Sequence, residues 1–79
     1  METIEDALIK AAMARCESEI ADAKAIVTLY LSTPVAVGDH SDLVTEILEA
    51  CDKGSSAQEK LEFLKEVTPR ANAIQNIKY

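Results

Sequence analysis

Seventy-nine residues are enough for one small domain, whose core lies near the lower limit of self-sufficiency. Apolar residues make up 48 % of the chain, with only two glycines, two prolines and three aromatics, which suits helices and disfavours an all-β fold that needs many turns. The net charge of −6 disfavours binding to nucleic-acid phosphates, which requires clustered lysines and arginines. We interpret the acidic surface as a source of solubility, with mimicry of DNA as a minor alternative.

The first predicted element is a long helix over residues 4–31. Thr3 followed by Asp6 resembles a capping box, and Glu5 suits the positive end of the helix dipole. Apolar residues then recur at alternating spacings of four and three, which predicts a seam that packs along a neighbouring helix. The seam residues are Ile9, Met13, Cys16, Ile20, Ala23, Val27 and Tyr30.

A short connection follows, and its residues break the helical pattern. Pro34 disfavours helical geometry at the residue before it, and Gly38 allows a turn conformation that other residues resist. Asp39, His40 and Ser41 are all candidate caps for the next helix. We expect Pro34 and Gly38 to set the turn.

The second predicted helix covers residues 41–68 and has a seam of the same spacing and nearly the same length. Its members are Leu43, Ile47, Ala50, Gly54, Ala57, Leu61 and Leu64. Gly54 weakens the helix, and Ser56 with Glu59 could instead cap a new one. Because the seam keeps its phase through Gly54, we predict one continuous helix with a soft or kinked middle. Equal lengths and a short connection predict an all-α antiparallel hairpin.

The sequence divides into a hairpin domain over residues 1–68 and a C-terminal segment over residues 69–79. Thr68 before Pro69 is a common way to start a helix. Ile74 and Ile77 lie three residues apart, which is consistent with a short third helix, while a mobile tail remains the alternative.

More apolar residues are present than one seam can bury, and we predict that they form an interface. The candidates are Ile26, Leu29, Leu31, Val44, Leu48, Ile74 and Ile77, with Cys51 beside them. A wide apolar face indicates a helix with more than one neighbour. We expect two hairpins to pair into a four-helix bundle, most simply as a homodimer. A surface kept for another protein is the alternative.

Cys16 and Cys51 are the only cysteines, one in each long segment. A turn centred near residues 36–37 places Cys16 opposite position 57, so that Cys51 lies about 9 Å further along the axis, beyond the reach of a disulfide. We predict reduced thiols in a cytoplasmic protein without a signal peptide or a membrane span.

Few residues suggest chemistry. His40 is the single histidine, so we expect no zinc site, and we expect no other metal, cofactor or small-molecule substrate. Glu46, Glu49 and Asp52 follow at three-residue steps, as do Glu19 and Asp22. Helical nucleotide pyrophosphatases hold magnesium with such carboxylates, so a magnesium-dependent hydrolase is a distant alternative, and a solvated acidic face is the simpler interpretation.

The segment from Thr33 to Asp42, followed by an acidic amphipathic helix that ends in Lys60-Leu61-Glu62-Phe63-Leu64, resembles a group of small uncharacterised helical proteins of tailed marine phages and ocean metagenomes. The similarity covers roughly residues 25–66 and depends mainly on the turn, with its proline, glycine, acidic residue and histidine. This chain departs from the pattern at Ser41, where proline is more frequent, and at Gly54. The resemblance implies a viral source and the cytoplasm of an infected host cell as the location, and it implies no mechanism.

These observations favour a non-enzymatic structural or accessory protein that self-associates through its helices. The second hypothesis is an adaptor that binds a host or viral protein through the apolar turn end. The hydrolase is the third.

Overall fold

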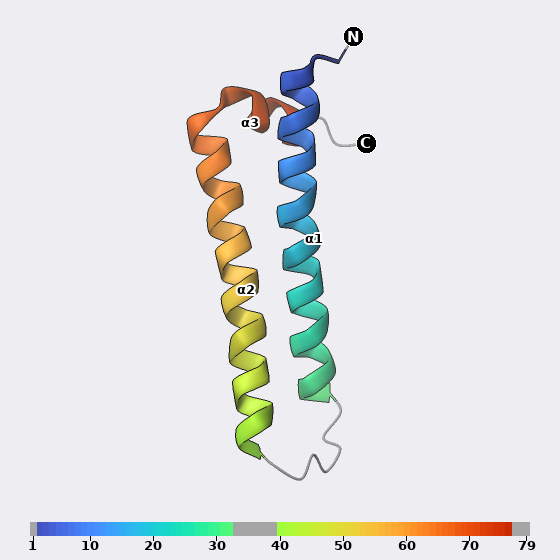
Figure 1. Ribbon diagram of the computed structural model, residues 1–79, viewed down its shortest axis with the longest axis vertical. Coiled ribbons are helices and arrows are strands. Elements are labelled where there is room, and N and C mark those ends of the chain that lie inside the picture. Colours follow the sequence, from blue (N-terminus) through green and yellow to red (C-terminus); the bar gives the residue numbers. More distant parts are fainter. Residues whose placement is uncertain (1, 33–39, 77–79) are drawn as a thin grey trace.

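The protein is an all-α helical hairpin with a short third helix (Figure 1). The computed structural model describes residues 2–32 and 40–76, and the side chains among them except those at positions 40, 41, 72 and 74–76. Helix α1 spans Ile4–Ser32, α2 spans His40–Val67 and α3 spans Pro69–Asn76. The two long helices run antiparallel, and their bounds lie within one residue of the predicted 4–31 and 41–68. The predicted fold class is therefore confirmed.

The start of α1 is the predicted capping box. The Asp6 amide donates a hydrogen bond of 3.0 Å to the Thr3 hydroxyl, and the Thr3 amide donates one of 3.5 Å to the Asp6 carboxylate. These bonds satisfy amides that have no partner inside the helix. At the other end of α1, the Ser32 hydroxyl donates to the Thr28 carbonyl at 2.7 Å.

The core lies where the two predicted seams meet. Every residue of both seams is buried or half-buried, whereas their immediate neighbours are mostly exposed. Much of the central contact is made by small side chains, since Ala23 is 4 % exposed and Ala57 is 1 % exposed. Larger residues fill the end of the hairpin beneath α3, where Met13 and Leu61 belong to one hydrophobic cluster.

Helix α2 runs unbroken through Gly54, as the phase of its seam predicts. The glycine faces Ala23 of α1, and a β-carbon at position 54 would lie only 2.9 Å from the Ala23 β-carbon. The sequence identifies Gly54 as a weak point in the helix, and the structure gives a reason for it. The missing side chain allows the axes of the two long helices to come close together.

The register between the helices differs from the estimate based on a centred turn. Because Ala23 faces Gly54, Cys16 lies near Leu61 rather than near position 57, and the two residues share the cluster under α3. The estimate was wrong by about four residues, or roughly 6 Å along the axis. Both cysteines are free, with Cys16 buried and Cys51 exposed.

Helix α3 folds back over the end of the hairpin at which α1 begins (Figure 1). The turn into it is short, because the Thr68 amide bonds to the Leu64 carbonyl and the Ala71 amide bonds to the Thr68 carbonyl, both at 3.1 Å. Ala71 is fully buried against the cluster that contains Met13 and Leu61. The segment after Pro69 thus forms a helix as far as Asn76, and that helix adds to the core.

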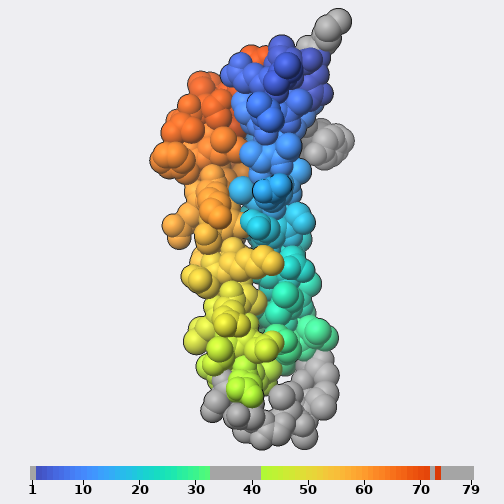
Figure 2. Space-filling view, viewed as in Figure 1, coloured from blue at the N-terminus to red at the C-terminus, as the bar shows by residue number. Residues whose placement is uncertain are grey.

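The whole molecule is long and narrow, with extents of 54 × 23 × 18 Å. Figure 2 shows the two long helices in contact along their length, with α1 forming one edge of the molecule. Across residues 2–32 and 40–76, no helix has both the length and the apolar composition to cross a bilayer.

Candidate interaction surfaces

The predicted turn surface lies largely outside the described residues. Pro34, Gly38 and Asp39 are not among them. His40 is the first residue of α2, and its side chain is also outside the description. A docking role for the turn therefore stays a prediction.

Four of the predicted interface residues are exposed apolar side chains near the turn end of the hairpin. Their exposed fractions are 58 % for Leu29, 69 % for Leu31, 55 % for Val44 and 61 % for Leu48. Ile26 is half-buried. Ile74 belongs to α3, but its side chain is outside the description, as is the whole of Ile77.

Leu29 and Leu31 do not belong to one flat patch. Residues two apart on an α-helix point about 200° away from each other around the axis. The two leucines therefore lie on opposite flanks of α1, with the outward-facing side of the helix between them.

A hydrogen bond joins the long helices near the same end. The Tyr30 hydroxyl donates to the Glu46 carboxylate. This bond, followed by partial burial and the negative charge of Glu46, raises the pKa of Tyr30 above its ordinary value of 10.0. The pair holds the final turn of α1 against the start of α2.

The opposite end of the hairpin exposes a second set of large apolar side chains that the sequence interpretation missed. Ile4 is 81 % exposed, Leu8 66 %, Phe63 64 % and Val67 60 %. Phe63 and Val67 border an open groove between α1 and α2 that also contains Ala12 and Cys16. The sequence could have predicted their exposure, because all four apolar residues fall outside the predicted seams.

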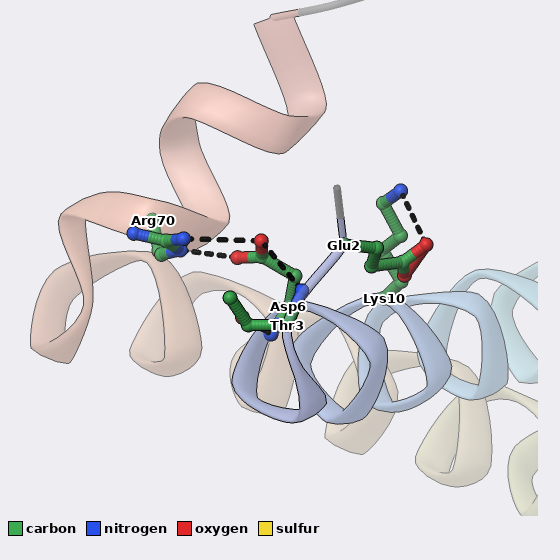
Figure 3. A network of polar contacts seen from close by, with 5 residues as sticks. All are labelled: Glu2, Thr3, Asp6, Lys10 and Arg70. Carbon is green, nitrogen blue, oxygen red and sulfur yellow. Dashed lines mark hydrogen bonds and ion pairs between the residues drawn. The ribbon is translucent and has the colours of Figure 1, made fainter.

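An ion pair connects the two ends of the described chain (Figure 3). The Arg70 guanidinium donates from Nε and from Nη2 to the two carboxylate oxygens of Asp6, the second bond being 3.0 Å long. Asp6 also belongs to the cap of α1, so one side chain both caps this helix and binds α3. Nearby, Lys10 lies 3.4 Å from Glu2.

The Arg70 contact lowers the pKa of Asp6 from 3.8 to about 2. Hydrogen bonds from Arg70 contribute most, partial burial acts in the opposite direction, and the cap bonds to Thr3 lower the pKa further. The pKa of Arg70 rises for the same reason. The carboxylate therefore stays ionised to low pH in the folded state.

The carboxylates considered for magnesium do not converge. Glu46, Glu49 and Asp52 are exposed on α2, and Asp22 pairs with Lys53 at 3.4 Å. Within residues 2–32 and 40–76, no three His, Cys, Asp or Glu side chains are grouped closely enough to hold a metal ion.

The comparisons with known proteins add no relative. No protein-family model matches the chain, and neither the curated proteins nor the solved structures give a match.

Proposed function

We propose that this protein is a non-enzymatic structural or accessory interaction protein that works as a self-associating helical hairpin, with a homodimer as the basic unit. The observation that carries the proposal is the distribution of exposed apolar side chains. They occur at both ends of the hairpin, on α1 and α2 alike, with exposed fractions of 55 % to 81 %. We take these side chains to be the part of the surface that another macromolecule covers.

The total surface supports the proposal. The chain has a mass of 8.6 kDa and an accessible surface of 5996 Å². A compact monomer of that mass exposes about 4,700 Å² by the usual scaling of surface with mass. The excess, roughly 1,300 Å², is larger than the ~800 Å² that each partner loses in an interface of standard size. A second hairpin could cover that surplus.

The experiment is light scattering over a hundredfold range of protein concentration. We expect a mass of twice 8.6 kDa at the upper concentrations, together with a helical circular dichroism spectrum. A helical protein that stays monomeric over the whole range would contradict the proposal.

The second candidate is an adaptor for a host or viral protein, which the exposed turn-end residues Leu29, Val44 and Leu48 favour. It predicts that the Leu29→Asp, Leu48→Asp double variant loses a partner while its own fold and mass stay unchanged. Conversion of a dimer into a monomer by these changes would assign the surface to self-association instead. Either role fits the cytoplasm, where Cys16 and Cys51 would stay reduced.

A magnesium-dependent hydrolase remains the distant alternative. Hydrolysis of nucleoside triphosphates by the purified protein with magnesium would establish it. The proposal of a non-enzymatic role predicts neither turnover nor a shift of the melting temperature when magnesium is added.

A further inference from the structure

The side of α1 that faces away from α2 carries no charged residue over its whole length. It consists of nine positions, alternately three and four residues apart, that begin at Ile4 and end at Ser32. Five are alanines and two are serines, with Ile4 and Thr28 completing the set, and all nine are exposed. We call this surface the outer face of α1.

The outer side of α2 is different. It exposes the carboxylates of Asp52, Glu59, Glu62 and Glu66. Surfaces that stay in water carry about 25–35 % charged residues. The contrast between the two helices indicates that α2 faces solvent while the outer face of α1 is covered.

Two rows of residues border the outer face, and each row repeats every seven residues. One row consists of Leu8, Arg15, Asp22 and Leu29. The other consists of Lys10, Glu17, Lys24 and Leu31. This is the layout of a coiled-coil seam with its flanking positions, in which the flanking charges decide which partner binds and in which direction.

We propose that the outer face of α1 binds the same face of a second copy, with the two α1 helices antiparallel and a two-fold axis between residues 19 and 20. The inference rests on the self-association proposed above and assigns the surface that makes it. In this register Ala14 lies opposite Ala25 of the second copy, and Ser18 lies opposite Ala21. Such small side chains permit close packing of the two helix axes.

The charges of the two border rows are complementary in this register. Arg15 lies opposite Asp22 of the second copy, and Glu17 lies opposite Lys24. The two-fold axis repeats both pairs, as an isologous interface requires. Each ionic contact in the rows therefore joins opposite signs.

The ends of the border rows match as well. Leu8 lies opposite Leu29 of the second copy, so two exposed leucines from opposite ends of α1 cover each other. Lys10 lies opposite Leu31, and the aliphatic part of the lysine can pack on the leucine while its ammonium stays in water. The interface thus removes three of the exposed leucines of α1 from water.

The parallel arrangement is disfavoured by the same residues. In a parallel coiled coil, a residue in one border row meets the residue five positions later in the other row of the partner. Lys10 would then meet Arg15, and Glu17 would meet Asp22, so that both ionic contacts would join like charges. The charge pattern therefore selects the antiparallel dimer.

The border charges are available for a partner. Among the described residues, Arg15, Glu17 and Lys24 take part in no ion pair within the chain. Asp22 contacts Lys53 at 3.4 Å through one oxygen, and both of these side chains are about half exposed. Asp22 can therefore bind Arg15 of the second copy without losing its present contact.

A charge exchange at positions 17 and 24 tests the assignment. The Glu17→Lys variant places two lysines opposite each other in its homodimer, and Lys24→Glu places two glutamates opposite each other. From the usual strength of exposed pairs, we expect each single variant to dimerise roughly tenfold more weakly than the wild type. A mixture of the two single variants restores opposite signs at every contact, as does the double variant, so both should recover the wild-type affinity.

Two controls isolate the face from general effects of charge and of apolar surface. Glu66→Lys makes the same change in net charge as Glu17→Lys but lies on the outer side of α2, so its dimer should keep the wild-type affinity. Leu29→Asp should weaken the dimer because it places a carboxylate against Leu8 of the second copy. Leu48→Asp changes a leucine of similar exposure that lies outside the interface, and it should have no effect.

The outcomes separate this inference from the proposal on which it rests. A wild-type protein that stays monomeric would overturn both. A wild-type dimer whose affinity is unchanged in Glu17→Lys, Lys24→Glu and Leu29→Asp would leave self-association standing and overturn the assignment to the outer face of α1. Recovery of affinity on mixing the two single variants is the result that we expect.

Discussion

Gly54 combines two opposing effects on the stability of α2. A glycine inside a helix costs about 1 kcal/mol relative to alanine. Here the absence of a side chain allows contact with Ala23, since an added β-carbon would lie 2.9 Å from the Ala23 β-carbon. The Ala23 methyl group cannot rotate away, so the helices themselves would have to separate.

We therefore predict that Gly54→Ala destabilises the protein despite its better helix propensity. Overpacking of a tight contact costs roughly 1–3 kcal/mol, which exceeds the gain in propensity. Denaturant unfolding at one fixed protein concentration measures the change. Ser55→Ala, at an exposed position of the same helix, is the matched control. Combining Gly54→Ala with Ala23→Gly should restore part of the loss, and a more stable Gly54→Ala protein would refute the close approach.

Asp6 gives the protein a specific sensitivity to acid. Its pKa is about 2 in the folded state, below its ordinary value of 3.8. A group with a lowered pKa in the folded state stabilises that state above its unfolded pKa and loses this effect as the pH falls through the folded pKa. The Arg70 contact thus contributes fully above pH 4 and fades between pH 4 and pH 2.

The Asp6→Asn variant should accordingly be less stable than the wild type at neutral pH, and the difference should shrink between pH 4 and pH 2. Thermal unfolding monitored by circular dichroism across this range is the measurement. Glu49→Gln, at an exposed acid in the first half of α2, toward the opposite end of the hairpin from Arg70, should show no such convergence. A constant gap between Asp6→Asn and wild type down to pH 2 would contradict the role of the ion pair.

At the scale of elements, α3 depends on a single small side chain for its fit. Ala71 is fully buried against the hydrophobic cluster, whereas Ala73, two residues later on the same helix, is exposed. We predict that Ala71→Lys lowers the free energy of unfolding by about 2–4 kcal/mol, because it forces a charge or a large side chain into the cluster. Ala73→Lys should leave it within about 0.5 kcal/mol of the wild type. Equal effects of the two changes would mean that α3 does not dock as described.

The pairing of α1 with α2 depends on both seams together. Ile20 and Ile47 lie half-buried between the long helices. Replacing both with aspartate places two charges in that contact, and we expect the helical circular dichroism signal to be lost. Leu48→Asp, on the exposed side of α2, should retain it. A double variant that stays helical and cooperative would refute the seam assignment.

The two seams could be predicted because their signal is local and repeats every seven residues. The heptad spacing continues through Gly54, and this continuity predicted that α2 is one helix. The pair of Thr3 and Asp6 predicted the start of α1. The register between the two helices could not be predicted, because it depends on where along the short connection the chain reverses direction. The heptad pattern within the helices does not encode that position. The Asp6–Arg70 pair could not be predicted either, since the local pattern does not encode the direction in which α3 leaves Thr68.

The outer face of α1 was recognisable in principle. The alanines of this helix predict helix formation and close approach, but their full meaning depends on which side of the helix they occupy. Once the structure assigns Ala23 to the contact with Gly54, the exposed alanines are seen to share the opposite side. The folded register was needed to separate the two sets.

At the scale of the whole molecule, a thin hairpin leaves much of its surface for a partner. Its extents are 54 × 23 × 18 Å, so few residues are far from solvent. If a second copy covers the surplus surface, the folded state is linked to dimerisation by mass action. We predict that the melting temperature rises with protein concentration over the range used for light scattering. A constant melting temperature in a protein that is dimeric throughout the scan would mean that the hairpin unfolds without dissociation.

The place of Ala71 in the core has a consequence for synthesis of the chain. Met13 and Cys16 are made early, but the cluster that buries them is closed by Ala71, which follows Met13 by 58 residues. At translation rates of 5–20 residues per second, that interval lasts roughly 3–12 s. During this time the nascent chain holds an unfinished apolar end, which a chaperone or a neighbouring nascent chain can reach before α3 does.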